Sequence, residues 1–333
     1  MIKTPLCDLL GIDYPILSAG MGVNIAGAEL TAAVSNAGGC GVLGSGGVPA
    51  PAMRQQLEAT RALTSRPFGV NLLLPLLQDG QVEAAIAAKV RFVVFFWGDP
   101  RPHLAPLKAA GIKVFVQVGT VEEGKALAAA GVDGLIAQGI EAGGHVKAES
   151  ALSTFLPAMV DAVAPLPVIA SGGIADGRGI AAALSLGAQG VSLGTRFLAT
   201  PEAQVDPAYK ARILAARAED TLYTGLFDVG WENAAHRVLR NAASEAWQAA
   251  GTPPPGQRPG EGEVIGQGDL LGFPVTYPRY AVTPAVPGFS GDLEHTALYA
   301  GESVRLIDTL MPAGEVVRRL VAETGAALAR LRP

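Results

Sequence analysis

The chain has 333 residues, a formal net charge of −5, 49% hydrophobic residues and 17% charged residues. This length suits one large α/β barrel with an insertion, or two ordinary domains, and the hydrophobic content supports a large buried core. The mild acidity and the lack of a basic stripe argue against a nucleic-acid partner. No apolar run reaches the roughly 18 residues that a membrane span needs, so we expect no membrane partner.

Cysteine usage and the N-terminal segment are typical of a cytoplasmic protein. Cys7 and Cys40 lie far apart without CxxC spacing, as in a reduced cytosolic chain. Residues 1–16 lack the apolar core of a secretory signal peptide. No cluster of His, Cys and acidic residues has metal-ligand spacing, so no bound metal is expected.

Short β-rich runs alternate with alanine-rich helical stretches over the first 200 residues. Strands are predicted at 15–19, 41–44, 68–72, 92–96, 113–118, 134–137, 168–170 and 191–193. Helices are predicted at 26–36, 51–63, 81–88, 102–109, 121–130, 154–163 and 179–186. Eight such units are typical of a TIM (β/α)8 barrel, and several strands read as the continuous apolar runs expected of strands buried on both faces.

The alternation stops after about Thr200. Residues 207–250 have helical character, with Ala, Arg and Glu at mixed spacing. Residues 251–292 are rich in Pro and Gly, which predicts a long loop. Long irregular segments in compact proteins are often functional covers.

Helical character returns near His295 and continues to a last helix predicted at 314–331. We therefore predict two units. Residues 1–200 and 311–333 form the cofactor-binding barrel, and residues 201–310 form a smaller, mainly helical subdomain inserted after the last barrel strand. This subdomain is expected to lie over the barrel mouth as a lid.

Two glycine-rich loops follow the last two predicted barrel strands. Ser171, Gly172 and Gly173 follow the first of these strands, and Gly194 and Thr195 follow the second. Glycines expose backbone N–H groups at the start of a following helix, and this pair of loops is the usual phosphate site of a (β/α)8 barrel. The alternative is that the glycines only form tight turns. The order and position of both loops favour a bound phosphate.

A third loop at the same end of the barrel carries a histidine. His145 follows Gly143 and Gly144 at the C-terminal end of a strand, where barrel enzymes place catalytic groups. An imidazole titrates near neutral pH, which suits a general base, whereas a lone histidine is often a structural residue. We predict His145 as the catalytic residue.

Glycines and amides at other strand ends predict a planar cofactor across the mouth. The first strand ends in Gly20-Met21-Gly22, whose glycines let a flat ring approach the backbone. Asn71 and Gln117 can offer paired donor and acceptor atoms to a heterocycle. The predicted cofactor contacts are Gly20, Met21, Gly22, Asn71, Gln117, Gln138, Gly144, Ser171, Gly172, Gly173, Gly194 and Thr195.

The remaining histidines receive different interpretations. His103 is placed at a helix start on the surface, and His236 is placed in the helical segment WENAAHRVLRN as a packing or ion-pairing residue. His295 and Tyr299 follow the Pro/Gly-rich loop, and we predict that they line the substrate pocket together with His145.

Several segments closely resemble nitronate monooxygenases, formerly called 2-nitropropane dioxygenases. They are GMGVNIAGAELTAAVSNAGGCGVLG (20–44), PFGVNL (67–72), QGIEAGGH (138–145), ASGGIADGRGIAAALSLGAQGVSLGTRFLAT (170–200) and YAGESV (299–304). The resemblance covers nearly the whole chain and implies a TIM barrel with non-covalent FMN. It also implies that the SGG and GTRF loops hold the FMN phosphate, that His145 is the catalytic base, and that the amides and residues 20–22 line the flavin.

The activity implied by the resemblance is oxidative denitrification of nitronates or nitroalkanes with O₂ as co-substrate. The protein could assemble as a homodimer. The same motifs occur in flavin-dependent enoyl-ACP reductases and NADH:quinone reductases, so an NAD(P)H-dependent reductase of a quinone or an enoyl thioester stays open. A non-enzymatic flavin-binding protein is a third alternative, against which His145 argues.

Overall fold

Eight parallel strands, each a short apolar run of the sequence, build the centre of the molecule in this computed structural model, which describes residues 2–330. They are β1 (Ile16–Ser18), β2 (Val42–Gly44), β3 (Gly69–Leu73), β4 (Phe92–Phe96), β5 (Lys113–Val118), β6 (Gly134–Gln138), β8 (Val168–Ser171) and β9 (Gly190–Leu193). Their order in the sheet is β1-β9-β8-β6-β5-β4-β3-β2. A parallel bridge between Leu17 and Cys40 joins the two edges, so the sheet is a nearly closed barrel.

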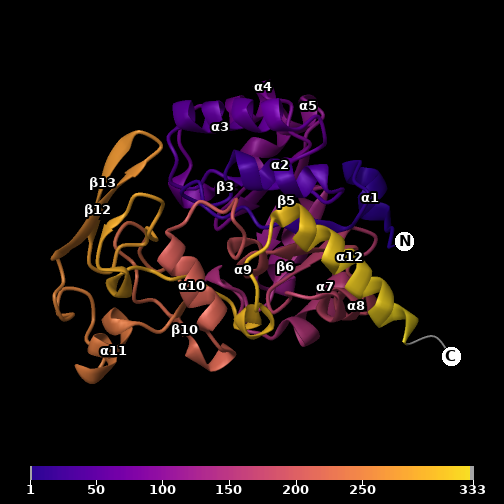
Figure 1. The fold of residues 1–333 in the computed structure, drawn as a ribbon. Coiled ribbons are helices and arrows are strands. Elements are labelled where there is room, and N and C mark those ends of the chain that lie inside the picture. The colour runs from indigo at the N-terminus through magenta and orange to yellow at the C-terminus, as the bar shows by residue number, and fades with distance from the viewer. Residues whose placement is uncertain (1, 331–333) are drawn as a thin grey trace.

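Helices follow the strands and cover the outside of the barrel (Figure 1). They are α2 (Ala28–Asn36), α3 (Ala50–Leu63), α4 (Gln81–Ala87), α5 (Arg101–Ala109), α6 (Val121–Ala129), α7 (Leu152–Val163) and α8 (Gly177–Ser185). The short helix α9 (Thr195–Leu198) follows β9. The last helix, α12 (Ala313–Ala329), packs against α8 and α2 and completes the outer layer.

In most barrel strands, alternate residues belong to two different apolar clusters. In β4, Val93 and Phe95 pack with the surrounding helices, whereas Phe92 and Val94 point into the barrel. Leu6 and Leu10 of α1 (Pro5–Leu10) join the interior cluster. Because α1 belongs to this inner cluster together with residues near the strand starts, the open end of the barrel is the one where the strands end.

The predicted barrel is confirmed. The eight predicted strands and the seven helices between them are present, with ends that differ from the prediction by at most two residues. The last helix was predicted at 314–331 and is described over Ala313–Ala329, while Leu331 lies outside the described residues. No helix within residues 2–330 is long and apolar enough to cross a membrane.

Residues 201–310 are less helical than the sequence predicts. Helices α10 (Pro207–Ala215) and α11 (Ala242–Ala249) are present, but β10 (Thr221–Thr224) and β11 (His236–Leu239) are strands, so the prediction of helix across 207–250 is wrong there. The physical reason is tertiary pairing. β11 is buried at all four positions and pairs with β10 on one side and with β7 (Gly144–His145) on the other.

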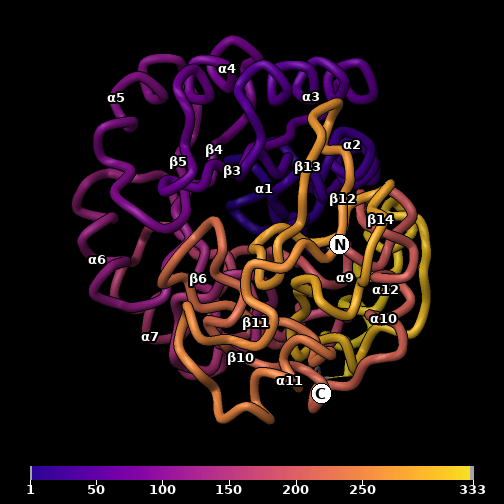
Figure 2. Tube along the Cα trace, turned by 90° about the vertical axis from the view of Figure 1, so that its left-hand side faces the viewer, coloured from indigo at the N-terminus to yellow at the C-terminus, as the bar shows by residue number. Residues whose placement is uncertain are grey.

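The predicted loop at 251–292 contains a hairpin. It is formed by β12 (Val264–Leu270) and β13 (Phe273–Pro278), and β14 (Ser290–Gly291) pairs with β12. In Figures 1 and 2 the tip of the hairpin reaches toward α3, at one side of the barrel. Two 3₁₀ helices, η3 (Leu293–His295) and η4 (Glu302–Leu306), follow it.

Candidate active site

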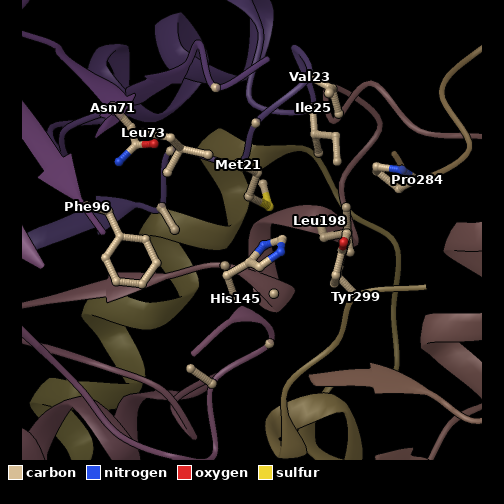
Figure 3. A pocket seen from close by; sticks show the side chains of 18 of the residues that line it. Met21, Val23, Ile25, Asn71, Leu73, Phe96, His145, Leu198, Pro284 and Tyr299 are labelled. Atoms are coloured by element: carbon tan, nitrogen blue, oxygen red, sulfur yellow. The ribbon is translucent and has the colours of Figure 1, made fainter. Parts of the chain in front are cut away.

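A cavity of ≈ 530 Å³ lies at the open end of the barrel, a volume typical of small-molecule sites (Figure 3). It brings together all the predicted cofactor contacts: Gly20, Met21, Gly22, Asn71, Gln117, Gln138, Gly144, Ser171, Gly172, Gly173, Gly194 and Thr195. His145 and Tyr299 line it as well. The described lining contains no Lys, Arg, Asp or Glu, so the walls carry no permanent charge.

The two glycine loops leave backbone donors free. Gly172 and Gly173 have φ angles of +103° and +69°, a region that favours glycine. Within residues 2–330 no backbone carbonyl accepts from the N–H groups of Gly173, Gly194 or Thr195. An added Cβ at Gly194 would meet only Ala19 Cβ, at 3.8 Å, so the space over this backbone is open. The loops therefore form a cradle that fits a phosphate.

The helix after the first of these loops is already capped. The Asp176 side chain accepts from the backbone N–H groups of Arg178 and Gly179 at 3.0 Å. The first N–H groups of α8 are thereby used. The negative charge of the Asp176 carboxylate would also repel an anion at the start of this helix. An anion in the cradle would consequently be held by the loop N–H groups before α8.

Thr195 connects the cradle to the segment near the C-terminus. Its Oγ1 accepts from the Gly301 N–H at 3.0 Å, which leaves the hydroxyl hydrogen free to donate. Gly143 lies against the same segment, since a Cβ there would fall 2.4 Å from the Gly301 nitrogen. The His145 loop, the cradle and residues 299–302 thus form one packed unit.

Three buried polar atoms around the cavity have no partner among the described residues. The Asn71 amide donates to the Val94 carbonyl at 3.3 Å, but Asn71 Oδ1 is unpaired. The Gln138 amide donates to the His145 carbonyl at 2.9 Å, but Gln138 Oε1 is unpaired, as is His145 Nε2. Because buried polar atoms normally have partners, this set fits a ligand with a hydrogen-bonding edge, such as a flavin ring.

His145 lies in the centre of the cavity beside Met21 (Figure 3). Its backbone pairs with His236 of β11, and its imidazole stacks on the Trp231 indole with ring centroids 4.1 Å apart. Burial lowers the pKa of His145 to about 3, and the neighbouring His236 adds to this effect. The imidazole is therefore neutral at physiological pH and is a weak base.

His236 has a structural environment. It is fully buried in a strand, not in the predicted helix. Its Nε2 accepts from the Phe227 N–H at 3.2 Å, and its Nδ1 donates to the Ala234 carbonyl at 2.8 Å. Burial lowers the pKa of His236 to about 4. Both ring nitrogens are thus used, and the ring is neutral.

Of the two residues predicted to line the substrate pocket with His145, Tyr299 lines this cavity and His295 does not. The Tyr299 hydroxyl donates to the Val282 carbonyl at 2.8 Å, and burial raises the pKa of Tyr299. The structure differs from the prediction at His295, which is not part of the lining. His295 Nδ1 lies 2.8 Å from Asp292 in η3, and η3 packs against α11. The 3₁₀ turn fixes it away from the cavity.

Two functional candidates were missed by sequence reasoning. Trp231 covers His145 from the segment after β10. Arg237 donates from Nε and Nη2 to the Ile140 carbonyl at 3.2 and 3.0 Å, and it forms an ion pair with Glu302 at 3.2 Å. It thereby anchors the loop that carries His145. The contact of Trp231 with His145 and that of Arg237 with Ile140 each join segments about 90 residues apart in the sequence. No local sequence motif therefore indicates either contact.

Solved structures resemble the whole chain. FabK from Thermotoga maritima matches with a TM-score of 0.84 and 33% identity, covering 100% of this chain and 99% of that chain. A nitroalkane oxidase from Streptomyces ansochromogenes matches with a TM-score of 0.79 and 29% identity, covering 98% and 99%. Fold, cavity and these likenesses define a flavin-dependent oxidoreductase built on a (β/α)8 barrel.

The family model described as nitronate monooxygenase matches residues 3–85 and 76–323. The chain belongs to the nitronate monooxygenase family. A nitronate monooxygenase of Paraburkholderia phytofirmans is 33% identical over 377 residues, covering 99% of this chain and 97% of that protein. A (3aS,4S,5R,7aS)-5-hydroxy-7a-methyl-1-oxo-octahydro-1H-indene-4-carboxyl-CoA dehydrogenase of Mycobacterium tuberculosis is 40% identical over 247 residues, covering 73% and 68%.

Proposed function

We propose that the protein is an FMN-dependent nitronate monooxygenase, which oxidises nitronates with O₂. The observation that carries this proposal is the combination of a cradle for one phosphate with uncharged walls and one neutral imidazole. Gly172, Gly173, Gly194 and Thr195 would hold the phosphate. The unpaired amide oxygens of the cavity would face the ring edge. When bound, FMN supplies the electron acceptor that oxidation of an electron-rich nitronate carbon requires.

FMN is proposed over FAD because the part of the chain that the structure describes offers one phosphate cradle. It has no strand–GxGxxG–helix unit for a dinucleotide. Mass spectrometry of the cofactor released by heat tests this assignment, and FAD would contradict it.

His145 would act on the substrate as a neutral group. Its ring N–H can donate to a nitronate oxygen, which needs no proton to be removed. Its lowered pKa makes it a poor base for the α-proton of a neutral nitroalkane, since a catalytic base works best with a pKa near the operating pH. A preformed nitronate is therefore the proposed substrate.

The walls of the cavity would exclude water from the reaction. Val229 and Trp231 line it from the segment after β10, and Val275 and Pro284 line it from the hairpin and the segment that follows. We infer from these contacts that residues 201–310 act as a cover over the barrel mouth. Uncharged walls also offer no cation to the pyrophosphate of a nicotinamide dinucleotide, which favours O₂ over NAD(P)H as the co-substrate.

A second candidate is an NAD(P)H-dependent flavin enzyme acting on a quinone or an acyl thioester. The 40% identity to a carboxyl-CoA dehydrogenase and the full-length likeness to FabK favour it. The two candidates differ in what reduces the flavin.

Anaerobic stopped-flow spectroscopy of the purified holoenzyme separates these candidates. The enzyme is mixed in separate runs with propionate 3-nitronate, an alkyl nitronate, NADH and NADPH, and flavin absorbance is followed. We expect loss of absorbance with a nitronate and O₂ consumption when air is admitted. Reduction by NADH or NADPH alone would contradict the monooxygenase and support the second candidate.

A further inference from the structure

We propose that Arg258 is a positioning residue for the active site: it clamps the turn at 226–231 and thereby holds the Trp231 indole over His145. Arg258 lies on the Pro/Gly-rich segment before β12 and is not part of the cavity lining, whereas Trp231 is part of it. The inference rests on the proposed function in that it takes His145 as the catalytic group. It gives a role in that site to a residue outside the cavity.

Arg258 is a buried cation whose hydrogen bonds converge on this turn. Its side chain is 3% exposed. Nη1 donates to the Leu226 carbonyl at 2.8 Å and to Asp228 Oδ1 at 2.7 Å. Nε donates to Glu261 Oε1 at 2.9 Å, and the guanidinium lies over the Tyr280 ring, 4.6 Å from its centroid. Because a buried charge depends on its partners, this arrangement fixes residues 226–228 relative to residue 258.

Asp228 connects the Arg258 guanidinium to Trp231. Its carboxylate pairs with Arg258, and its backbone carbonyl accepts from the Trp231 N–H at 2.9 Å. That hydrogen bond closes a tight turn over residues 228–231, in which Gly230 has a φ of +102°, in the left-handed region that favours glycine. The position of the indole therefore follows the position of Asp228.

Arg258 also contacts the segment on the other side of the turn. The Val229 N–H donates to the Tyr280 carbonyl at 3.1 Å, and the Val282 N–H donates to the Val229 carbonyl at 3.0 Å. These backbone bonds hold the middle of the turn, and Arg258 stacks on Tyr280 from the same segment. The guanidinium thus joins the two sides, which the backbone bonds alone do not fix at Asp228.

Loss of the cation would leave the Asp228 carboxylate without its ion-pair partner. This side chain is 13% exposed, and a charge that is largely buried and unpaired is strongly destabilised. The carboxylate should then turn toward water and move the 228–231 turn with it. The Trp231 ring, whose centroid lies 4.1 Å from that of His145, would no longer cover the imidazole.

The first experiment measures how fast diethyl pyrocarbonate acylates His145 in the holoenzyme at neutral pH, with peptide mass spectrometry to assign the site. Arg258→Met keeps a long side chain and removes the cation with its donors. We expect the His145 rate constant to rise at least about tenfold as the indole moves. The rate constant of His103, which stacks on Phe95, is the internal reference and should not change. An unchanged His145 rate constant would overturn the proposal.

A matched control tests whether any lost arginine of this region has the same effect. Arg279 pairs with Glu263 at 3.1 Å, close to Arg258 in the fold but without an ion pair to Asp228. Arg279→Met should leave the His145 rate constant at the wild-type value. An equal rise in Arg258→Met and Arg279→Met would show a general loosening of the segment and would contradict a specific clamp.

The Trp231→Ala background tests the route of the effect. In that variant His145 has already lost its cover, so adding Arg258→Met should change neither the acylation rate constant nor kcat/KM any further. In the wild-type background the same substitution should lower kcat/KM about tenfold, because a misplaced catalytic group loses its orientation. The fall in Tm should be similar in both backgrounds. Equal effects of Arg258→Met on rate constant and kcat/KM in both backgrounds would mean that Arg258 does not act through Trp231.

Asp228→Asn is the second variant and covers the case in which Arg258→Met does not fold. It removes the negative charge and keeps the backbone carbonyl that holds Trp231, so the His145 rate constant should rise in the same direction by a smaller factor. No rise would overturn the proposal. Acylation needs no turnover, so a response of His145 as expected in an enzyme that oxidises no nitronate would support the clamp, and the monooxygenase assignment alone would fail.

Discussion

The imidazole of His145 stacks on the indole of Trp231, with ring centroids 4.1 Å apart and an angle of 24° between the planes. Trp231 is itself buried, and it meets the Trp97 ring edge-on, with centroids 5.3 Å apart and an angle of 75° between the planes. The Trp231 and Trp97 rings together shield one side of the His145 imidazole from water. Since burial is the main cause of the low pKa of His145, the Trp231 indole contributes to keeping the imidazole neutral.

Replacing Trp231 should raise the pKa of His145. In Trp231→Ala, water reaches the imidazole, and the pKa should move from about 3 toward 6.5 by about one to two units. NMR titration of the histidine ring measures the change. Trp231→Phe keeps the stacking and should show a smaller shift. Trp247→Phe, which removes an indole of α11 outside the cavity lining, is the control. An unchanged pKa in Trp231→Ala would contradict this role.

The pH profile of the reaction follows from the same pKa. A histidine with a pKa of about 3 stays neutral until the pH approaches that value. For a preformed nitronate, kcat/KM should thus be level from about pH 8 to about pH 5, without the step near 6.5 of an exposed histidine. Initial-rate measurements in constant-ionic-strength buffers test this. A step near 6.5 that disappears in His145→Asn would show that His145 titrates normally.

Acid should destabilise the fold through His236. Its pKa is lowered to about 4 in the folded protein, against 6.5 when exposed. Below about pH 6.5 the unfolded chain therefore binds a proton that the folded chain does not, and stability falls as the pH drops toward 4. The free energy of unfolding should fall by about 3 kcal/mol over this pH range. Urea unfolding at several pH values measures it, and His236→Gln should flatten this part of the profile. An unchanged slope in the variant would contradict the assignment.

The barrel could be predicted because its signals are local. Each strand is a short apolar run and each helix an alanine-rich stretch, so element type follows from neighbouring residues. The error at 207–250 has the opposite origin. His236–Leu239 forms a strand because it pairs with β10 and with the His145 loop, and those partners lie far away in the sequence.

The same distinction holds within the site. The glycines of the cradle are visible in the sequence because a positive φ, as at Gly172 and Gly173, selects glycine itself. Trp231 and Arg237 carry no such signal, because their contacts depend on packing between residues 201–310 and the barrel. The prediction that His295 lines the cavity fails because sequence proximity to Tyr299 does not reveal that His295 ends a 3₁₀ turn.

Arg237 should position the His145 loop. Its guanidinium makes two hydrogen bonds to the Ile140 carbonyl, a geometry that lysine cannot reproduce. Arg237→Met should lower kcat with retention of FMN and cost about 1–3 kcal/mol of stability. Arg237→Lys should restore part of the stability but little of kcat. Arg240→Met, which removes a more exposed arginine bonded to Gln248, is the control. Equal kcat in the Met, Lys and wild-type enzymes would contradict a positioning role.

The phosphate cradle is tested most cleanly at Gly194. Its φ is −92°, and an added Cβ would meet only Ala19 Cβ at 3.8 Å, so Gly194→Ala should fold normally. The new methyl group would occupy the space over the free N–H groups and should weaken FMN binding about 10–100-fold, because displaced hydrogen bonds to a charged phosphate each contribute about 1.5–3 kcal/mol. Gly194→Val should yield largely apoprotein.

The matched control for this prediction is Gly225→Ala, an exposed glycine outside the cavity lining whose Cβ would meet nothing within 4 Å. Flavin content after purification, and fluorescence titration of the apoproteins with FMN, measure the effect, and circular dichroism checks the fold. Of these two glycines, Gly194 lines the cavity and Gly225 does not. Substitution of Gly194, but not of Gly225, should therefore lower the FMN content. Full FMN occupancy in both Gly194 variants would place the phosphate elsewhere and would contradict the proposed cradle.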